Sequence, residues 1–207
     1  MAPDLRGHGR SPRSESYALE AHAEDVAQTV VHHAPDARAV SVLGHSMGGV
    51  IALALASGCY GFTPKAALGL GIKIVWTDAE TEGLAVRARA PAKTFATSAE
   101  AAAFYLKVAG LRGLVSENSA IARAGLAADG LQLAADPATG LIGPPPMDDL
   151  IAAARCPVHL AAGESDPMCA LADIRLHDPH AVTIAGAAHN AMIEAPERVW
   201  DWAKNRV

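Results

Sequence analysis

The stretch Val42-Leu43-Gly44-His45-Ser46-Met47-Gly48-Gly49 holds one serine in a turn of small residues. The apolar residues 39–43 predict a short strand before the turn, and residues 50–56 supply strong helix formers after it. We expect glycine to be required two positions before and two after the serine, because side chains there would collide with the strand and the helix. The turn would present the Ser46 hydroxyl at a helix N-terminus, where the Met47 N–H can donate to an oxyanion. This pattern is typical of a nucleophile elbow.

The G-x-S-x-G motif alone is weak evidence that its serine is a catalytic nucleophile. Such matches arise by chance, and many glycine–serine turns only connect two elements. The strand before the turn, the helix after it and the second glycine of Gly48-Gly49 favour a nucleophile. If Ser46 is a nucleophile, the chain must also supply a base and an acid.

Composition indicates a globular protein with a sizeable core. The 207 residues are 51% hydrophobic and 19% charged, and the formal net charge is −5. This mild acidic excess gives no electrostatic reason to expect nucleic acid or an anionic membrane as a partner. The opening residues do not resemble an export signal, and no apolar run reaches the ~20 residues of a membrane span. We therefore expect a soluble, cytoplasmic protein.

Three cysteines, Cys59, Cys156 and Cys169, are widely spaced and odd in number. This arrangement fits neither a disulfide framework nor a zinc-ligand pattern. We expect small, buried, reduced residues.

Helical and strand-like segments alternate along most of the chain. Residues 16–33 show helical apolar spacing, Pro35-Asp36 predicts a turn, and residues 66–75 form a second strand-like run. Two later strands are predicted at 156–162 and 180–185, followed by a helix that begins at Pro196. Short connections of this kind imply a mostly parallel α/β sheet, with functional groups gathered at the carboxyl ends of the strands.

The segment between Trp76 and Met147 breaks this alternation. It shows helical stretches interrupted by glycines, a capping box at Thr97-Ser98-Ala99-Glu100, and a rigid end at Gly143-Pro144-Pro145-Pro146. We interpret it as a helical lid that carries the substrate pocket. The predicted organisation is a core at residues 1–75, a helical cap at 76–150 and the rest of the core at 151–207.

Ser46, Asp166 and His189 each follow a predicted strand, so their loops converge at one edge of a parallel sheet. A serine hydroxyl needs an imidazole to remove its proton as it attacks, and His189 is our candidate base. Asp166 would fix the imidazole tautomer and stabilise the imidazolium. The chain order Ser, Asp, His distinguishes the arrangement from other serine-hydrolase folds.

Other residues compete for these roles. Asp78 and Glu164 are alternative acids, and Asp166 is favoured because it lies at the tip of the turn after its strand. His8, in a glycine-containing loop, is held in reserve as a site residue. The remaining nearby histidines are interpreted as structural: His45, His159, His177 and His180.

The sequence resembles the capped α/β-hydrolase family, which includes many small bacterial esterases, over nearly its whole length. Four segments match: the polar opening Pro3–Ser11, the elbow 44–49, the acid turn 163–167, and the histidine loop 186–189 with Glu194-Ala195-Pro196. Without this resemblance, Pro3–Ser11 could be interpreted as a frayed polar terminus. The resemblance implies an α/β-hydrolase fold with serine esterase chemistry.

The same resemblance implies that members of this family carry several strands and a His-Gly-type loop before the segment that corresponds to Pro3–Ser11 of this chain. That loop normally supplies half of the oxyanion hole, and one such donor contributes about 2.7–4 kcal/mol of transition-state stabilisation. Those strands would also flank residues 39–43, which otherwise form an apolar edge. We therefore expect an N-terminally shortened chain that lacks the N-terminal strands, with Met47 as its identifiable oxyanion donor.

These observations predict a cofactor-free serine hydrolase that acts on a small-molecule ester, thioester or lactone through an acyl-Ser46 intermediate. The alternatives are an acyltransferase on the same scaffold and a non-catalytic or truncated relative with an incomplete oxyanion hole. An apolar acyl pocket is expected from five side chains. They are Trp76, Phe104, Tyr105, Met168 and Met192.

Overall fold

The computed structural model describes residues 1–34 and 40–207, which form two compact units. The sheet unit consists of Leu19–Thr77 and Pro144–Val207, and the helical unit of Met1–Ala18 and Asp78–Gly143. The division into 1–75, 76–150 and 151–207 stays a prediction. The units differ from it most at the N-terminus, because residues 1–18 pack with the helical segment.

Four parallel strands form the sheet of the sheet unit, in the order β1-β2-β3-β4. They are β1 (Val42–His45), β2 (Ala67–Leu70), β3 (Val158–Gly163) and β4 (Val182–Ile184). Val42 lies opposite Ala67, and Ala67 lies opposite Val158. All four carboxyl ends therefore meet one edge of the sheet, where catalytic loops of parallel sheets gather. The predicted α/β fold class with a parallel sheet is confirmed.

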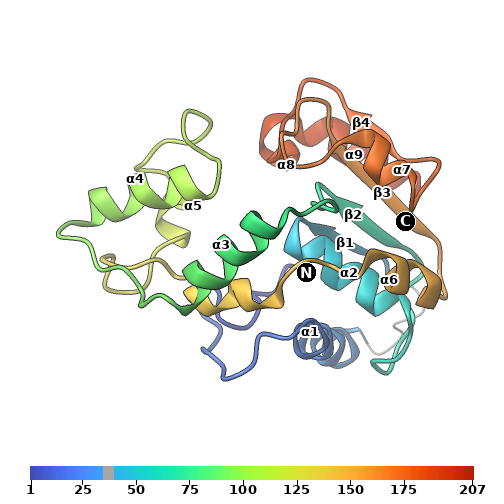
Figure 1. Ribbon diagram of the computed structural model, residues 1–207, viewed down its shortest axis with the longest axis horizontal. Coiled ribbons are helices and arrows are strands. Elements are labelled where there is room, and N and C mark those ends of the chain that lie inside the picture. The colour runs from blue at the N-terminus through green and yellow to red at the C-terminus, as the bar shows by residue number, and fades with distance from the viewer. Residues whose placement is uncertain (35–39) are drawn as a thin grey trace. The chain divides into compact units, whose positions relative to one another are not determined.

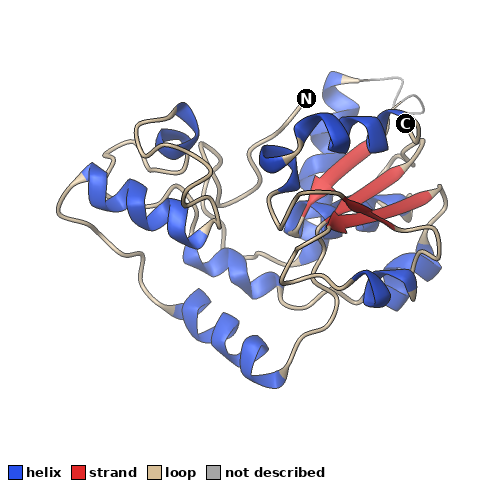
Figure 2. Cartoon of the chain, turned by 90° about the horizontal axis from the view of Figure 1, so that it is seen from above, coloured by secondary structure: helices blue, strands red, loops and turns tan. Residues whose placement is uncertain are grey.

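Helices cover both faces of this sheet (Figures 1 and 2). Side chains alternate along β3. Leu160 and Ala162 pack in one apolar cluster with Val50 of α2 (Met47–Ala56). Ala161 packs in a second cluster with Trp202 of α9 (Pro196–Lys204). The helices of this unit are α1 (Leu19–His33), α2 (Met47–Ala56), α6 (Met147–Ala153), α7 (Leu171–Arg175), α8 (Ala191–Glu194) and α9 (Pro196–Lys204).

Helix α2 is buried on all sides, since every residue from Gly49 to Ala56 is buried. A helix that is apolar all round belongs in a core. Its first residue is Met47, three positions before the predicted start at residue 50. Ser46 is therefore the N-cap residue, directly between β1 and α2.

Several predicted boundaries differ from the observed ones. The strand predicted at 66–75 ends at Leu70, because Gly71 adopts a φ of 64° that an extended strand cannot contain. The helix predicted at 16–33 begins at Leu19, and the strands predicted at 156–162 and 180–185 are observed as β3 and β4. The turn predicted at Pro35-Asp36 and residue 39, the start of the strand predicted at 39–43, lie outside the described residues.

The helical unit contains α3 (Asp78–Arg89), α4 (Ser98–Val108), α5 (Ala120–Ala124) and the 3₁₀ helix η2 (Pro137–Ile142). As predicted, residues 76–147 contain no strand, only isolated bridges such as Arg112–Val115. The Thr97 half of the predicted capping box is confirmed, since Thr97 Oγ1 accepts from the Glu100 N–H. The Glu100 carboxylate accepts from the Ala96 N–H, one residue before the N-cap, and not from the N-cap N–H of a complete box. Among the described helices, none has both the length and the apolar character needed to cross a membrane.

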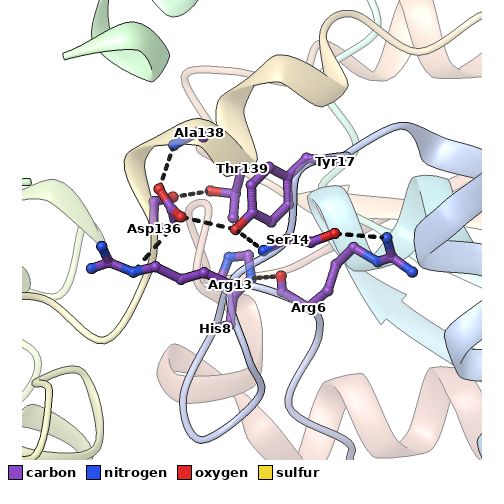
Figure 3. A network of polar contacts seen from close by, with 8 residues as sticks. All are labelled: Arg6, His8, Arg13, Ser14, Tyr17, Asp136, Ala138 and Thr139. Atoms are coloured by element: carbon purple, nitrogen blue, oxygen red, sulfur yellow. Dashed lines mark hydrogen bonds and ion pairs between the residues drawn. The ribbon is translucent and has the colours of Figure 1, made fainter. Parts of the chain in front are cut away.

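The polar N-terminal segment is not frayed, because it is tied to the turn before η2 (Figure 3). The Tyr17 hydroxyl donates to Asp136 Oδ2 at 2.9 Å and accepts from the Ser14 N–H at 3.0 Å. The Asp136 N–H donates to the Gly7 carbonyl at 2.7 Å, and Arg13 lies 3.7 Å from the Asp136 carboxylate. Asp136 therefore orders residues 1–18 within the helical unit, through its carboxylate at Arg13 and Tyr17 and through its backbone N–H at Gly7.

Candidate active site

Ser46 occupies a strained turn at the carboxyl end of β1. Its backbone has a φ of 52° and a ψ of −121°. Among the described residues, Ser46 is the one non-glycine residue with a positive φ. Such a conformation costs of order 1–3 kcal/mol and persists where surrounding contacts fix it. Here the Ser46 N–H donates to the Leu70 carbonyl at 2.8 Å, and the Ser46 carbonyl accepts from the Gly49 N–H at 2.9 Å. The turn is thus fixed to β2 on one side and to α2 on the other.

The two glycines that flank the serine are not equivalent. A Cβ on Gly44 would lie 1.9 Å from the Gly48 carbonyl oxygen, which is backbone and cannot move aside. A Cβ on Gly48 would meet no atom within 4 Å. The expectation that both positions require glycine is therefore wrong for Gly48, since only Gly44 lies against the facing backbone.

The other two predicted catalytic residues are hydrogen-bonded to each other. His189 Nδ1 lies 2.9 Å from Asp166 Oδ2, and the Asp166 side chain has no exposed surface. The second carboxylate oxygen accepts from the Met168 N–H at 2.8 Å. Because a carboxylate can only accept here, Nδ1 is the donor of this bond, and Nε2 is the ring nitrogen that it leaves available.

The acid loop and the histidine loop are also joined through their backbones. The Ser165 N–H donates to the Ala187 carbonyl at 2.9 Å, and the Gly186 N–H donates to Glu164 Oε2 at 2.9 Å. Glu164, a rival for the acid role, is thus engaged with the backbone of the histidine loop.

His45 links the serine turn to the histidine loop. Its Nε2 lies 2.8 Å from the His189 carbonyl oxygen, so Nε2–H is the donor, and the two ring centroids are 4.7 Å apart. Because His45 directly precedes Ser46, this bond holds the serine turn next to His189, the candidate base. No local sequence pattern predicts this contact, since its partners are 144 residues apart.

Cys169 is a further buried neighbour of Asp166. Burial is the main cause that raises the pKa of the Cys169 thiol, and the neighbouring Asp166 carboxylate raises it further. Asp166, Cys169 and His189 form the group of potential metal ligands found in the described residues, with ligand atoms within 4.8 Å of one another. Metal binding would need the thiolate, which this environment disfavours. The three side chains fit a hydrogen-bonded acid and base better than a metal centre.

The remaining predicted site residues are divided between the two units. Met47, Met168, Met192 and Trp76 belong to the sheet unit, where Met168 is 40% exposed and the Trp76 indole N–H donates to the Lys73 carbonyl. The helical unit contains the others, Phe104, Tyr105, the rival acid Asp78 and the reserve histidine His8.

Below about pH 6.5 we expect the fold to lose stability through His45. Burial lowers the pKa of His45 from its ordinary value of 6.5, and the neighbouring His189 ring lowers it further. The hydrogen bond to the His189 carbonyl and the Asp166 charge oppose this shift. The unfolded chain therefore binds a proton that the folded chain resists, and the free energy of unfolding falls as the pH drops through the window below 6.5. Urea unfolding at about pH 7.5 and about pH 5.5 tests this, with a smaller pH dependence expected for His45→Gln. Equal pH dependence in both proteins would contradict it.

Comparison with known proteins assigns the sequence to a family. The sequence model described as "Alpha/beta hydrolase family" matches residues 1–202. None of the curated proteins compared with the chain matches it.

Solved structures share the fold at low sequence identity. An E-2-(acetamidomethylene)succinate hydrolase is similar with a TM-score of 0.74 and 22% identity, over 98% of this chain and 78% of that one. A thioesterase domain from the curacin biosynthetic pathway has a TM-score of 0.72 and 21% identity, over 97% and 78% of the two chains. A thermophilic esterase from Thermogutta terrifontis has a TM-score of 0.70 and 22% identity, over 98% and 77%.

Proposed function

The chain belongs to the alpha/beta hydrolase family, and we propose that it is a serine hydrolase that cleaves a small ester, thioester or lactone through an acyl-Ser46 intermediate. The single observation that carries the proposal is the 2.9 Å hydrogen bond between His189 and Asp166, on a loop that His45 ties to the Ser46 turn. The names of the similar structures, a hydrolase, a thioesterase domain and an esterase, support acyl substrates of this kind.

Each group has one role in the proposed acylation. The Ser46 oxygen forms a bond to the acyl carbon while His189 Nε2 takes the hydroxyl proton. Asp166 keeps Nδ1 protonated and stabilises the imidazolium. The carbonyl oxygen becomes an oxyanion, and the Met47 N–H, which has no intrahelical acceptor at the first position of α2, donates to it.

Collapse of this intermediate breaks the bond between the acyl carbon and the leaving group, which receives the proton from His189. Water then attacks the acyl-enzyme, gives its proton to His189, and releases the carboxylic acid and the Ser46 hydroxyl. No metal or redox step enters this sequence, so no cofactor is needed. The N-terminus of α2, a helix of ten residues, favours the negative charge at each oxyanion.

Pre-steady-state hydrolysis tests the proposal. At least one of four substrates should show Ser46-dependent turnover. They are p-nitrophenyl acetate, p-nitrophenyl butyrate, a small thioester and a lactone. An ester with a good leaving group should give a burst of about one equivalent of product as the acyl-enzyme forms. Ser165→Ala is the matched control, because this exposed serine lies in the acid loop without a catalytic role. Turnover that survives Ser46→Ala, or no turnover of any of these acyl compounds, would contradict the proposal.

His45 is expected to act as a positioning residue in this reaction. His45→Leu removes the hydrogen bond to the His189 carbonyl, and displacement of a base by about 1 Å lowers kcat by about 10- to 100-fold. His45→Gln keeps an N–H donor and should restore part of the loss, with KM little changed in both variants. Steady-state kinetics and thermal unfolding of the two variants check this. Equal kcat in His45→Leu and the unmodified protein would show that the contact does not position the base.

A further inference from the structure

The helical unit contains a cavity of about 470 Å³ that is largely open to solvent and runs along α4 from Glu100 to Lys107. This volume lies within the range of small-molecule sites. Its lining combines two aromatic rings with four charged side chains, and all of these residues belong to the helical unit. The residues that matter below are Lys93, Phe95, Glu100, Phe104, Lys107 and Arg112.

Two phenylalanines hold a lysine in the cavity. The rings of Phe95 and Phe104 have centroids 5.1 Å apart, and Lys93 Nζ lies 4.7 Å from the first centroid and 4.8 Å from the second. Cation–π attraction to two rings keeps this ammonium group over an apolar surface. A charged donor and an apolar wall are therefore adjacent in the cavity.

The charges that line the cavity are unbalanced. Lys93, Lys107 and Arg112 contribute three positive charges, and none of them forms an ion pair with another described residue. Glu100 is the one carboxylate in the lining, and it is engaged by the Ala96 N–H at the start of α4. A negatively charged ligand would meet cations that are not neutralised by the protein.

Loop contacts fix the wall of the cavity. The Phe95 N–H donates to the Leu131 carbonyl at 2.9 Å, and Gln132 Nε2 donates to Thr94 Oγ1 at 2.8 Å. These bonds attach residues 94–95 to a segment far along the chain. Because the aromatic wall is ordered before a ligand arrives, binding would not have to order it.

We propose that this cavity binds a small organic anion whose charged group pairs with Lys93, Lys107 and Arg112 and whose apolar body packs on Phe104. An aryl phosphate or an aryl carboxylate has this chemistry. The guanidinium of Arg112 can pair with two oxygens of either group. The site lies within the helical unit and needs no chemistry at Ser46, so it stands or falls separately from the proposed hydrolase activity.

Calorimetric titration of the full chain tests the site with four probes: phenyl phosphate, benzoate, inorganic phosphate and benzyl alcohol. Phenyl phosphate or benzoate should bind saturably, and the stronger of the two identifies the preferred head group. Inorganic phosphate lacks the apolar body and benzyl alcohol lacks the charge, so each should bind at least about tenfold more weakly. Lys93→Met and Arg112→Gln should each weaken the stronger probe by about tenfold or more. Phe104→Leu should weaken that probe and leave inorganic phosphate unchanged.

Lys65→Ala is the matched control, since Lys65 is an exposed lysine of the sheet unit and should leave the affinity unchanged. Lys93 and Arg112 are exposed, so their variants should keep the fold, which circular dichroism checks. The proposal would be overturned by the absence of saturable binding, by benzyl alcohol binding as tightly as the anions, or by unchanged affinity in Lys93→Met and Arg112→Gln.

Discussion

Replacing Ser46 with alanine is expected to lower kcat/KM for an ester substrate by about 10⁴- to 10⁶-fold. The change removes the oxygen that forms the acyl bond and leaves the Met47 N–H and the helix N-terminus in place. His189→Ala should cost a similar factor, and Asp166→Asn about 10⁴-fold, because an amide can hold the wrong imidazole tautomer. The double variant Ser46→Ala/His189→Ala should be no worse than either single change, since the two groups act as one unit.

Steady-state kinetics measure these losses, with Ser165→Ala as the control that should keep full activity. Thermal unfolding of each variant must accompany them, because a loss of fold would also remove activity. A Ser46→Ala protein that is folded and retains more than about 1% of the activity would contradict the role assigned to the serine.

Gly44→Ala is expected to lower the free energy of unfolding by more than about 3 kcal/mol. The new methyl group would overlap the Gly48 carbonyl, and the backbone can avoid it only by opening the turn that carries Ser46. Gly48→Ala offers a control with the same change of side chain. Its methyl group meets nothing within 4 Å and lies in the first turn of α2, so stability should change by less than about 1 kcal/mol and rise if helix propensity dominates.

Urea unfolding of the two variants at neutral pH decides this prediction, because each free energy is compared with that of the unmodified chain. Equal effects at the two positions would mean that the close approach of β1 to the start of α2 does not determine the glycine requirement. An unchanged free energy of unfolding in Gly44→Ala would contradict the prediction in the same way.

The sequence was sufficient for the parts of the site that depend on local pattern. The elbow around Ser46, and the positions of Asp166 and His189 after later strands, follow from apolar runs that end in turn residues. In a parallel sheet such turns lie at one edge, so distant residues could be expected to meet. The hydrogen bond between Asp166 and His189 agrees with that expectation.

Other features depend on distances that no local pattern contains. The motif treats Gly44 and Gly48 alike, whereas only the first lies against backbone. The bond from His45 to the His189 carbonyl joins residues 144 positions apart, and the bond from Tyr17 to Asp136 joins residues 119 positions apart. Such contacts follow from how elements pack, and the residue types alone are compatible with many partners.

Phe104 and Tyr105 are adjacent in the sequence but have different surroundings in the structure, and the acyl pocket expected from them stays a prediction. Both were expected to contribute to an apolar acyl pocket, and both belong to α4. Phe104 lines the charged cavity, whereas the Tyr105 ring packs so closely on Gly125 that a Cβ there would lie 2.4 Å from it. Neighbouring helix residues point in directions about 100° apart, so adjacent aromatic residues rarely share one pocket.

Covalent labelling with a fluorophosphonate tests the central assignment, Ser46 as an activated nucleophile, most directly. The unmodified chain should gain the mass of one probe molecule, and peptide mapping should locate that mass on Ser46. Ser46→Ala should gain none, His189→Ala should label far more slowly, and Ser165→Ala should label like the unmodified chain. No adduct on the folded, unmodified chain, or an adduct on a residue other than Ser46, would contradict the assignment.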